Sequence, residues 1–142
     1  MSETPTTAPM SALSGAGRDV VTLRLPAASA YLSVLRTATA SLASRLDFTI
    51  DEIEDLRIAV DEACAMLLVQ AVPGAELECS FELTGDAIDV AVTVATLDGE
   101  EPSRATFAWT VLTALAGQVD SSVDAERRVT LVLHKRRESG PA

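Results

Sequence analysis

The sequence predicts an α+β fold, a two-layer sandwich of about five strands and three helices. Three observations favour this class. Long segments carry apolar residues at three- and four-residue steps, which is typical of amphipathic helices. Shorter segments alternate apolar and polar residues, which indicates strands with only one face packed on a core. The segments follow the order strand, helix, helix, two strands, helix, two strands, so the helices are expected to form a separate layer on the sheet.

The first two predicted elements are a strand and a helix. The strand runs from Val20 to Leu25 and stops at Pro26, which has no amide hydrogen to donate to a neighbouring strand. The helix is expected to begin at Ser29, whose hydroxyl can serve as an N-cap. Its core-facing residues recur at helical spacing and comprise Tyr31, Leu35, Ala38, Leu42 and Leu46.

The second predicted helix has a sharper start. Thr49 can cap it while Glu52, three residues later, reaches back, which together make a capping box. Acidic residues in its first turn, such as Asp51, suit the positive end of the helix dipole. The helix should end near Pro73-Gly74, and its buried face is expected to contain Ile53, Leu56, Val60, Ala63, Leu67 and Ala71.

The remaining segments predict two hairpins with a helix between them. In the first hairpin the turn is Thr84-Gly85-Asp86. A third helix follows a polar loop, and a closing hairpin turns around Asp124-Ala125-Glu126. The inward residues of the first hairpin are Leu77, Cys79, Phe81, Leu83, Ile88, Val90, Val92 and Val94, and those that mark the third helix are Phe107, Val111, Leu112 and Leu115.

The chain length of 142 residues is that of one domain with one core. Residues 1–18 are rich in Ser, Thr, Pro, Ala and Gly and lack apolar period, so we expect a flexible N-terminal tail. Residues 19–137 are expected to form the folded domain. Residues 138–142 are expected to form a short C-terminal tail.

The net charge of −10 argues against nucleic acid as a direct partner, because phosphate binding needs clustered Lys and Arg. The one basic run, His134 to Arg137, is expected to be solvated. An acidic body suits a basic protein partner. No apolar stretch approaches the ~20 residues of a membrane span, and no secretory signal opens the chain, so a cytoplasmic location without a membrane contact is expected.

The sequence predicts no metal site and no cysteine nucleophile. Cys64 and Cys79 are too few for a disulfide framework and lack metal-ligand spacing. Both are therefore interpreted as reduced core residues. His134, the single histidine, is expected on the surface.

Two segments resemble a known family. Leu56 to Cys64, on the second helix, is similar to the anti-sigma factors of the SpoIIAB and RsbW type. Phe107 to Ala116 resembles the actinobacterial branch called UsfX or UshX. The resemblance runs from about Val20 to Arg136. It implies the histidine-kinase-like ATPase fold, also called GHKL or Bergerat, and a homodimer.

The resemblance also shows what the nucleotide site lacks. Kinases of this family present a Glu as general base and, four residues later, an Asn that holds magnesium. Glu62 matches the base, but Met66 stands at the Asn position. A thioether is a poor ligand for magnesium, which prefers oxygen. Glu62 is therefore interpreted as a vestigial base, with an ordinary place on a solvated helix face as the alternative.

Two further nucleotide motifs are reduced. The family carries an Asp-x-Gly-x-Gly loop for the adenine, of which only Asp98 and Gly99 remain. An Asp-Gly pair is also a common turn, so these residues are vestigial at best. Between Pro102 and Trp109 there is no glycine to form a phosphate lid, and Glu100 and Glu101 would repel phosphate. No cofactor is expected; Mg-ATP would bind only if the kinase alternative holds.

Binding has better support than catalysis. Family anti-sigma factors carry an Arg on the first helix that contacts the sigma factor and the rival anti-anti-sigma protein, and Arg36 matches it. An ordinary exposed Arg is the alternative. Trp109 is a second candidate for an interface, with a core position as the favoured interpretation.

The leading hypothesis is an anti-sigma factor without kinase activity. It would sequester an alternative stress or development sigma factor from RNA polymerase and be released by an anti-anti-sigma protein of the STAS type. One alternative is an ATP-dependent serine kinase that phosphorylates that antagonist. Another is a non-enzymatic dimeric adaptor or ligand-sensing domain.

Overall fold

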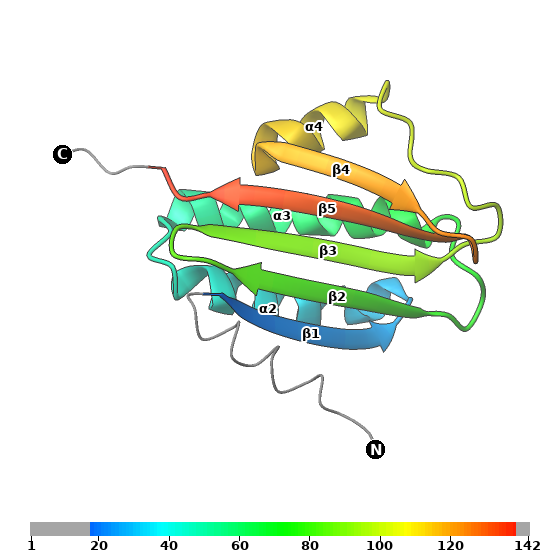
Figure 1. Cartoon of the computed structure of the whole chain (residues 1–142), viewed down its shortest axis with the longest axis horizontal. Coiled ribbons are helices and arrows are strands. Elements are labelled where there is room, and N and C mark those ends of the chain that lie inside the picture. Colours follow the sequence, from blue (N-terminus) through cyan, green and yellow to red (C-terminus); the bar gives the residue numbers. More distant parts are fainter. Residues whose placement is uncertain (1–17, 139–142) are drawn as a thin grey trace, which may run out of the picture.

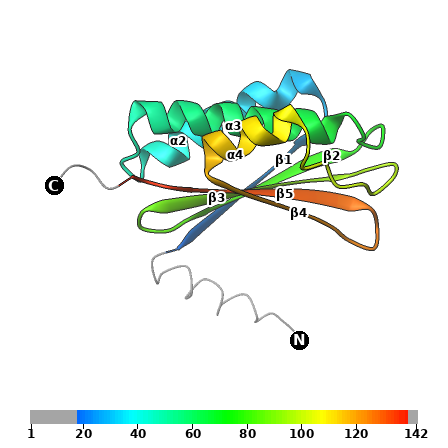
Figure 2. The ribbon, with the colours of Figure 1, turned by 90° about the horizontal axis from the view of Figure 1, so that it is seen from above.

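Alternating apolar residues place the five strands in one antiparallel sheet, and the helices cover one face of it (Figures 1 and 2). The computed structural model describes residues 18–138. The sheet order is β1-β2-β3-β5-β4. The strands are β1 (Asp19–Pro26), β2 (Glu76–Leu83), β3 (Ala87–Ala95), β4 (Gln118–Val123) and β5 (Arg128–Arg136), and the helices are η1 (Ser29–Tyr31), α2 (Leu32–Ser44), α3 (Ile50–Leu68) and α4 (Phe107–Ala116).

This architecture confirms the predicted α+β sandwich and the order of its elements. The predicted tails fall outside the described residues, apart from Arg18 and Glu138. Arg18 pairs with Glu82 at 2.8 Å. The amide of Glu138 donates to the Glu52 carboxylate at 2.8 Å.

The register of the sheet aligns its apolar residues in rows that face the helices. One row runs from Phe81 to Val90, Leu133 and Val119 across four neighbouring strands. All four side chains are buried. Because side chains alternate between faces, the polar partners fall on the open face, where the hydroxyls of Thr93 and Thr130 are 2.7 Å apart. Both predicted hairpins are confirmed.

The start of α2 differs from the prediction. Ser29 does not cap a helix but opens the 3-10 turn η1, in which the amide of Leu32 bonds to the Ser29 carbonyl. This tighter turn changes the helical phase, so the buried residues of α2 are Leu32, Leu35, Thr39 and Ala43. Tyr31 is 44% exposed, so its predicted core position is wrong. Thr39 is tolerated inside because its hydroxyl donates to the Leu35 carbonyl at 2.8 Å.

The start of α3 is as predicted, and its end comes earlier. Thr49 and Glu52 form the capping box. The last helical residue is Leu68, not a residue near Pro73. The helix stops there because the next residues bond to the end of β3 and the residue after it: the amide of Val72 donates to the Ala95 carbonyl at 2.9 Å, and Ala71 forms a bridge with Thr96.

Glu52 joins the start of α3 to the end of the chain. Its side chain is buried, with 6% of the residue exposed. One carboxylate oxygen accepts the Thr49 amide at 2.7 Å, and the other accepts the Glu138 amide at 2.8 Å. Burial raises the pKa of this carboxyl group, but the two backbone hydrogen bonds, the Thr49 side chain and the positive charge of Lys135 together hold its pKa below the ordinary value of 4.5.

Glu52→Gln should therefore lower the free energy of unfolding by about 1–2 kcal/mol, because an amide accepts only one of the two bonds. The stabilisation is complete above the unfolded-state pKa and is lost as pH falls through the lower folded-state pKa. Urea titrations from pH 7 to pH 3 measure this: the gap between wild type and variant should close toward pH 3. Asp51→Asn, an exposed neighbour in the same turn, should cost only a few tenths of a kcal/mol. Equal losses for the two variants, or a pH-independent gap, would contradict this assignment.

Candidate functional site

Arg36 and Asp61 join the two long helices. The Arg36 Nη1 atom donates to both oxygens of Asp61, at 2.9 and 3.2 Å. The two side chains are 36% and 34% exposed, so the pair lies at the surface and reaches solvent. The sequence proposes Arg36 as a partner-binding residue from its place on the first helix. It does not predict the ion pair, because a contact between residues 25 positions apart depends on how the helices align.

Glu62 and Met66 lie one turn apart on α3. Both side chains are half-buried, and Met66 packs against the hydrophobic core. Residues four apart share a helix face, so α3 carries a thioether at the position where the family resemblance implies a magnesium ligand. Within residues 18–138, no group of three His, Cys, Asp or Glu side chains is close enough together to hold a metal ion.

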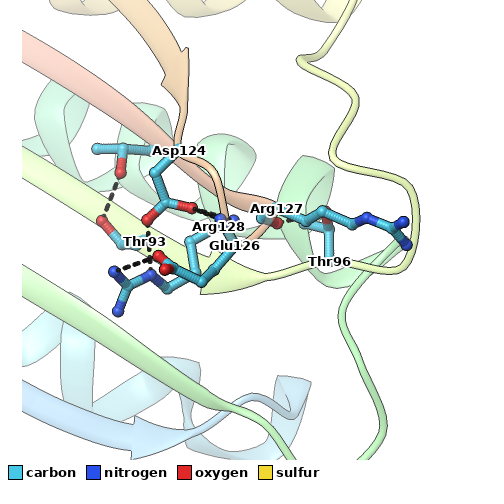
Figure 3. Close-up of polar contacts among 7 residues, drawn as sticks. Thr93, Thr96, Asp124, Glu126, Arg127 and Arg128 are labelled. Carbon is cyan, nitrogen blue, oxygen red and sulfur yellow. Dashed lines mark hydrogen bonds and ion pairs between the residues drawn. The ribbon is translucent and has the colours of Figure 1, made fainter.

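Asp98 and Gly99 form a turn that is tied to the opposite hairpin. The amide of Gly99 donates to the Thr96 hydroxyl at 2.8 Å, and that hydroxyl donates to the Arg127 carbonyl at 2.7 Å. The Arg127 Nη1 atom donates to the Leu97 carbonyl at 3.0 Å. Figure 3 shows the Arg127 side chain directed toward this loop. The hydrogen bonds of this turn therefore give Gly99 a structural role that does not require a bound nucleotide.

The turn between β4 and β5 is fixed by Asp124. Its Oδ1 atom accepts the Arg128 amide at 2.8 Å, and its Oδ2 atom accepts Nε of the same residue at 2.7 Å (Figure 3). These bonds from Arg128 hold the pKa of the Asp124 carboxyl group below its ordinary value. The hairpin thus presents Arg127, at φ 65°, as a fixed support for the Asp98-Gly99 turn.

Gly99→Ala tests this account of the turn. Gly99 has φ +69°, and a Cβ there would lie 3.1 Å from Cγ of Arg127, so the variant adds a steric contact to an unfavourable backbone angle. We expect a loss of about 1–2 kcal/mol in the free energy of unfolding. Gly74→Ala is the matched control, because Gly74 has φ +82° but nothing within 4 Å. A control loss as large as the Gly99 loss would contradict the packing role of Gly99.

The loop from Leu97 to Thr106 is fastened where the family resemblance implies a phosphate lid. Gln70, just after α3, donates from Nε2 to the Glu100 carbonyl at 2.8 Å. Ser121 of β4 donates to Glu101 and accepts from Arg104 at 3.3 Å. Figures 1 and 2 place this loop at the end of the molecule where α3 ends and α4 begins.

The N-terminus of α4 is also occupied by the chain itself. The Thr106 hydroxyl accepts the Trp109 amide at 3.1 Å, which satisfies one donor that could otherwise meet a phosphate oxygen. Trp109 is buried, as favoured from the sequence. The Arg104 guanidinium lies 4.8 Å from the centre of its ring and covers it. Phe107, in contrast, is 82% exposed.

The two cysteines and the single histidine have ordinary structural positions. Cys64 and Cys79 are both buried, and burial raises the pKa of Cys79 to about 12 and that of Cys64 further. Such thiols stay protonated and unreactive. His134 is half-buried on the open face of the sheet, where its Nδ1 atom contacts Asp89.

Comparison with known proteins gives the family. No family model matches the chain. The anti-sigma-F factor RsbW of Mycobacterium tuberculosis H37Rv is 32% identical over 111 residues, which cover 78% of this chain and 66% of that protein. The chain belongs to the RsbW family. The serine-protein kinase RsbW of Bacillus subtilis is 35% identical over 77 residues, which cover 52% of this chain and 48% of the kinase.

A solved structure supports the fold of this RsbW-family chain. The crystal structure of the RsbU and RsbW domains of Rv1364c from M. tuberculosis matches 87% of this chain, and 34% of that one, with a TM-score of 0.67 and 16% identity. At this identity the likeness concerns the fold alone. The chain spans less than two thirds of the length of the RsbW relatives that it matches. None of its helices in residues 18–138 has the length and apolarity of a membrane span.

Proposed function

We propose that this chain is an anti-sigma factor that binds an alternative sigma factor in the cytoplasm and keeps it from RNA polymerase. Family membership supports the anti-sigma role. The partner surface is proposed to lie on α2, with Arg36 as its charged anchor. The acidic chain, with a net charge of −10, suits a basic partner.

The proposed mechanism does not use ATP. The observation that carries this part is Met66, one turn after Glu62 on the same face of α3, because its thioether offers no oxygen ligand for the magnesium that accompanies a transferable triphosphate. The fastened loop from Leu97 to Thr106 agrees, since its bonds to Gln70 and Ser121 occupy the place of a lid. Release is proposed to come from competition by an anti-anti-sigma protein of the STAS type, set by relative affinity and abundance. A homodimer is part of the proposal.

The kinase alternative would use Glu62 as base and phosphorylate the STAS antagonist. Two measurements separate it from the proposal: calorimetry with Mg-ATP, and phosphate transfer to the antagonist, with B. subtilis RsbW as the positive control. We expect no heat of binding and no transfer by this chain. Micromolar binding of Mg-ATP, or any transfer abolished by Glu62→Gln, would overturn the non-catalytic part.

The adaptor alternative predicts a different set of partners. Purified chain carrying an affinity tag would be incubated with each alternative sigma factor of the host, expressed singly. The proposal expects capture of at least one of them at stoichiometric yield without added nucleotide. Failure with every sigma factor would remove the anti-sigma role and favour the adaptor.

A further inference from the structure

Asp61 holds one end of the Arg36 guanidinium. Arg36 projects from α2 and Asp61 from α3, so the guanidinium bridges two helices instead of moving freely on one. Both bonds come from one nitrogen, Nη1, at 2.9 and 3.2 Å from the two carboxylate oxygens. The side chain is therefore held at one end, and its orientation is set by α3.

The rest of the guanidinium remains available. A guanidinium has five N–H donors, and within residues 18–138 the hydrogen bonds of Arg36 all start from Nη1. Nε and Nη2 together present three donors in a planar fork. The side chain is 36% exposed, so an incoming group can reach that fork. Two parallel bonds from such a fork match a carboxylate.

The surroundings favour a carboxylate over a phosphate. Asp61 and Glu62 are adjacent and acidic, and Ile58, one turn before Asp61 on the same helix, is an exposed apolar residue. Nearby negative charge penalises a dianion more than a monoanion. A carboxylate that approaches the Nε and Nη2 side lies across the guanidinium from Asp61, so the cation stands between the two acids.

We infer that Asp61 is a positioning residue: it orients Arg36 so that the free Nε and Nη2 donors clamp a carboxylate of the partner protein. The inference rests on the proposed function, because the partner is the sigma factor proposed above. Ordering a long side chain on binding weakens affinity by about 2- to 12-fold. Asp61 removes that loss in advance, because the ion pair orders Arg36 in the free protein.

The test measures the dissociation constant for the sigma factor that the wild-type chain captures, by calorimetry without nucleotide. Asp61→Ala should weaken binding by about 2- to 12-fold. Glu54→Ala is the matched control, because Glu54 is exposed and its ion pair with Arg57 lies within α3; it should leave the constant unchanged within twofold.

A double variant, Arg36→Asp with Asp61→Arg, separates positioning from stability. It re-forms an ion pair between the helices but moves the guanidinium to α3. We expect its thermal midpoint to recover relative to Asp61→Ala while its binding stays at least as weak as that of Asp61→Ala. Unchanged or tighter binding by Asp61→Ala, or recovered binding by the double variant, would overturn the inference. Absence of binding by the wild-type chain would instead overturn the proposed function, and the inference with it.

Discussion

Arg36→Glu should weaken binding of the sigma factor by at least about 30-fold. The reversal replaces a fork of donors with an acid, so a carboxylate on the partner meets repulsion where it met two bonds; losing one side of such a charge pair costs 2–5 kcal/mol or more. The new acid also faces Asp61, 2.9 Å from the present Arg36 nitrogen. That local repulsion should cost the free protein only about 1 kcal/mol, because the site is partly exposed.

Arg45→Glu provides the control for this reversal. Arg45 follows α2 directly and is exposed, and its reversal changes the net charge of the chain by the same amount. Calorimetry at one ionic strength should show a change below threefold for Arg45→Glu. Comparable losses for the two variants would mean that Arg36 acts only through overall charge, and unchanged binding by Arg36→Glu would place the interface elsewhere.

Phe81→Ala should have the largest effect on stability. Phe81 is the largest fully buried side chain in residues 18–138, and it lies in β2 between Val21 and Val90 of the neighbouring strands. Truncating a buried phenylalanine removes its transfer free energy and leaves a cavity, which together cost about 3–5 kcal/mol. This is a large fraction of the stability of a small domain.

Phe107→Ala is the matched comparison, because it removes the same atoms from a residue that is 82% exposed. Guanidinium unfolding curves should show a change within about 0.5 kcal/mol for this variant. A loss of several kcal/mol at Phe107 would contradict its position outside the core. A loss below 1 kcal/mol at Phe81 would contradict the packing of the sheet against the helices.

The parts of the fold predicted from sequence are those encoded by local pattern. Residues 76–95 alternate so regularly that strand, turn and return strand follow from the two-residue period. The capping box of Thr49 and Glu52 is likewise local. The face of α2 was misplaced at Tyr31, because the 3-10 turn before the helix changes its phase and leaves no distinctive sequence signal.

The sequence proposes the residues of the candidate site, but it does not give their contacts. Glu62, Arg36, Asp98 and Gly99 were selected by family resemblance, which identifies positions. The pairing of Arg36 with Asp61 depends on the register between two helices. The support of Gly99 by Arg127 depends on two loops that approach from different strands. Such contacts join residues far apart in sequence, and nothing in the local pattern specifies them.

An anti-sigma factor without a kinase reaction would operate as a binding equilibrium. The sigma factor and the STAS antagonist would compete for binding to the chain. A shift in their relative abundance would then change the concentration of free sigma factor. Arg36 and Asp61 are then central, because affinity alone would carry the regulation. This chain would not inactivate the STAS antagonist by phosphorylating it.

The most direct test of this account is the affinity for the captured sigma factor, measured by calorimetry in nucleotide-free buffer and again with Mg-ATP. The account predicts tight binding in both conditions, with dissociation constants that agree within twofold. Binding that requires Mg-ATP, or no binding in either condition, would contradict it.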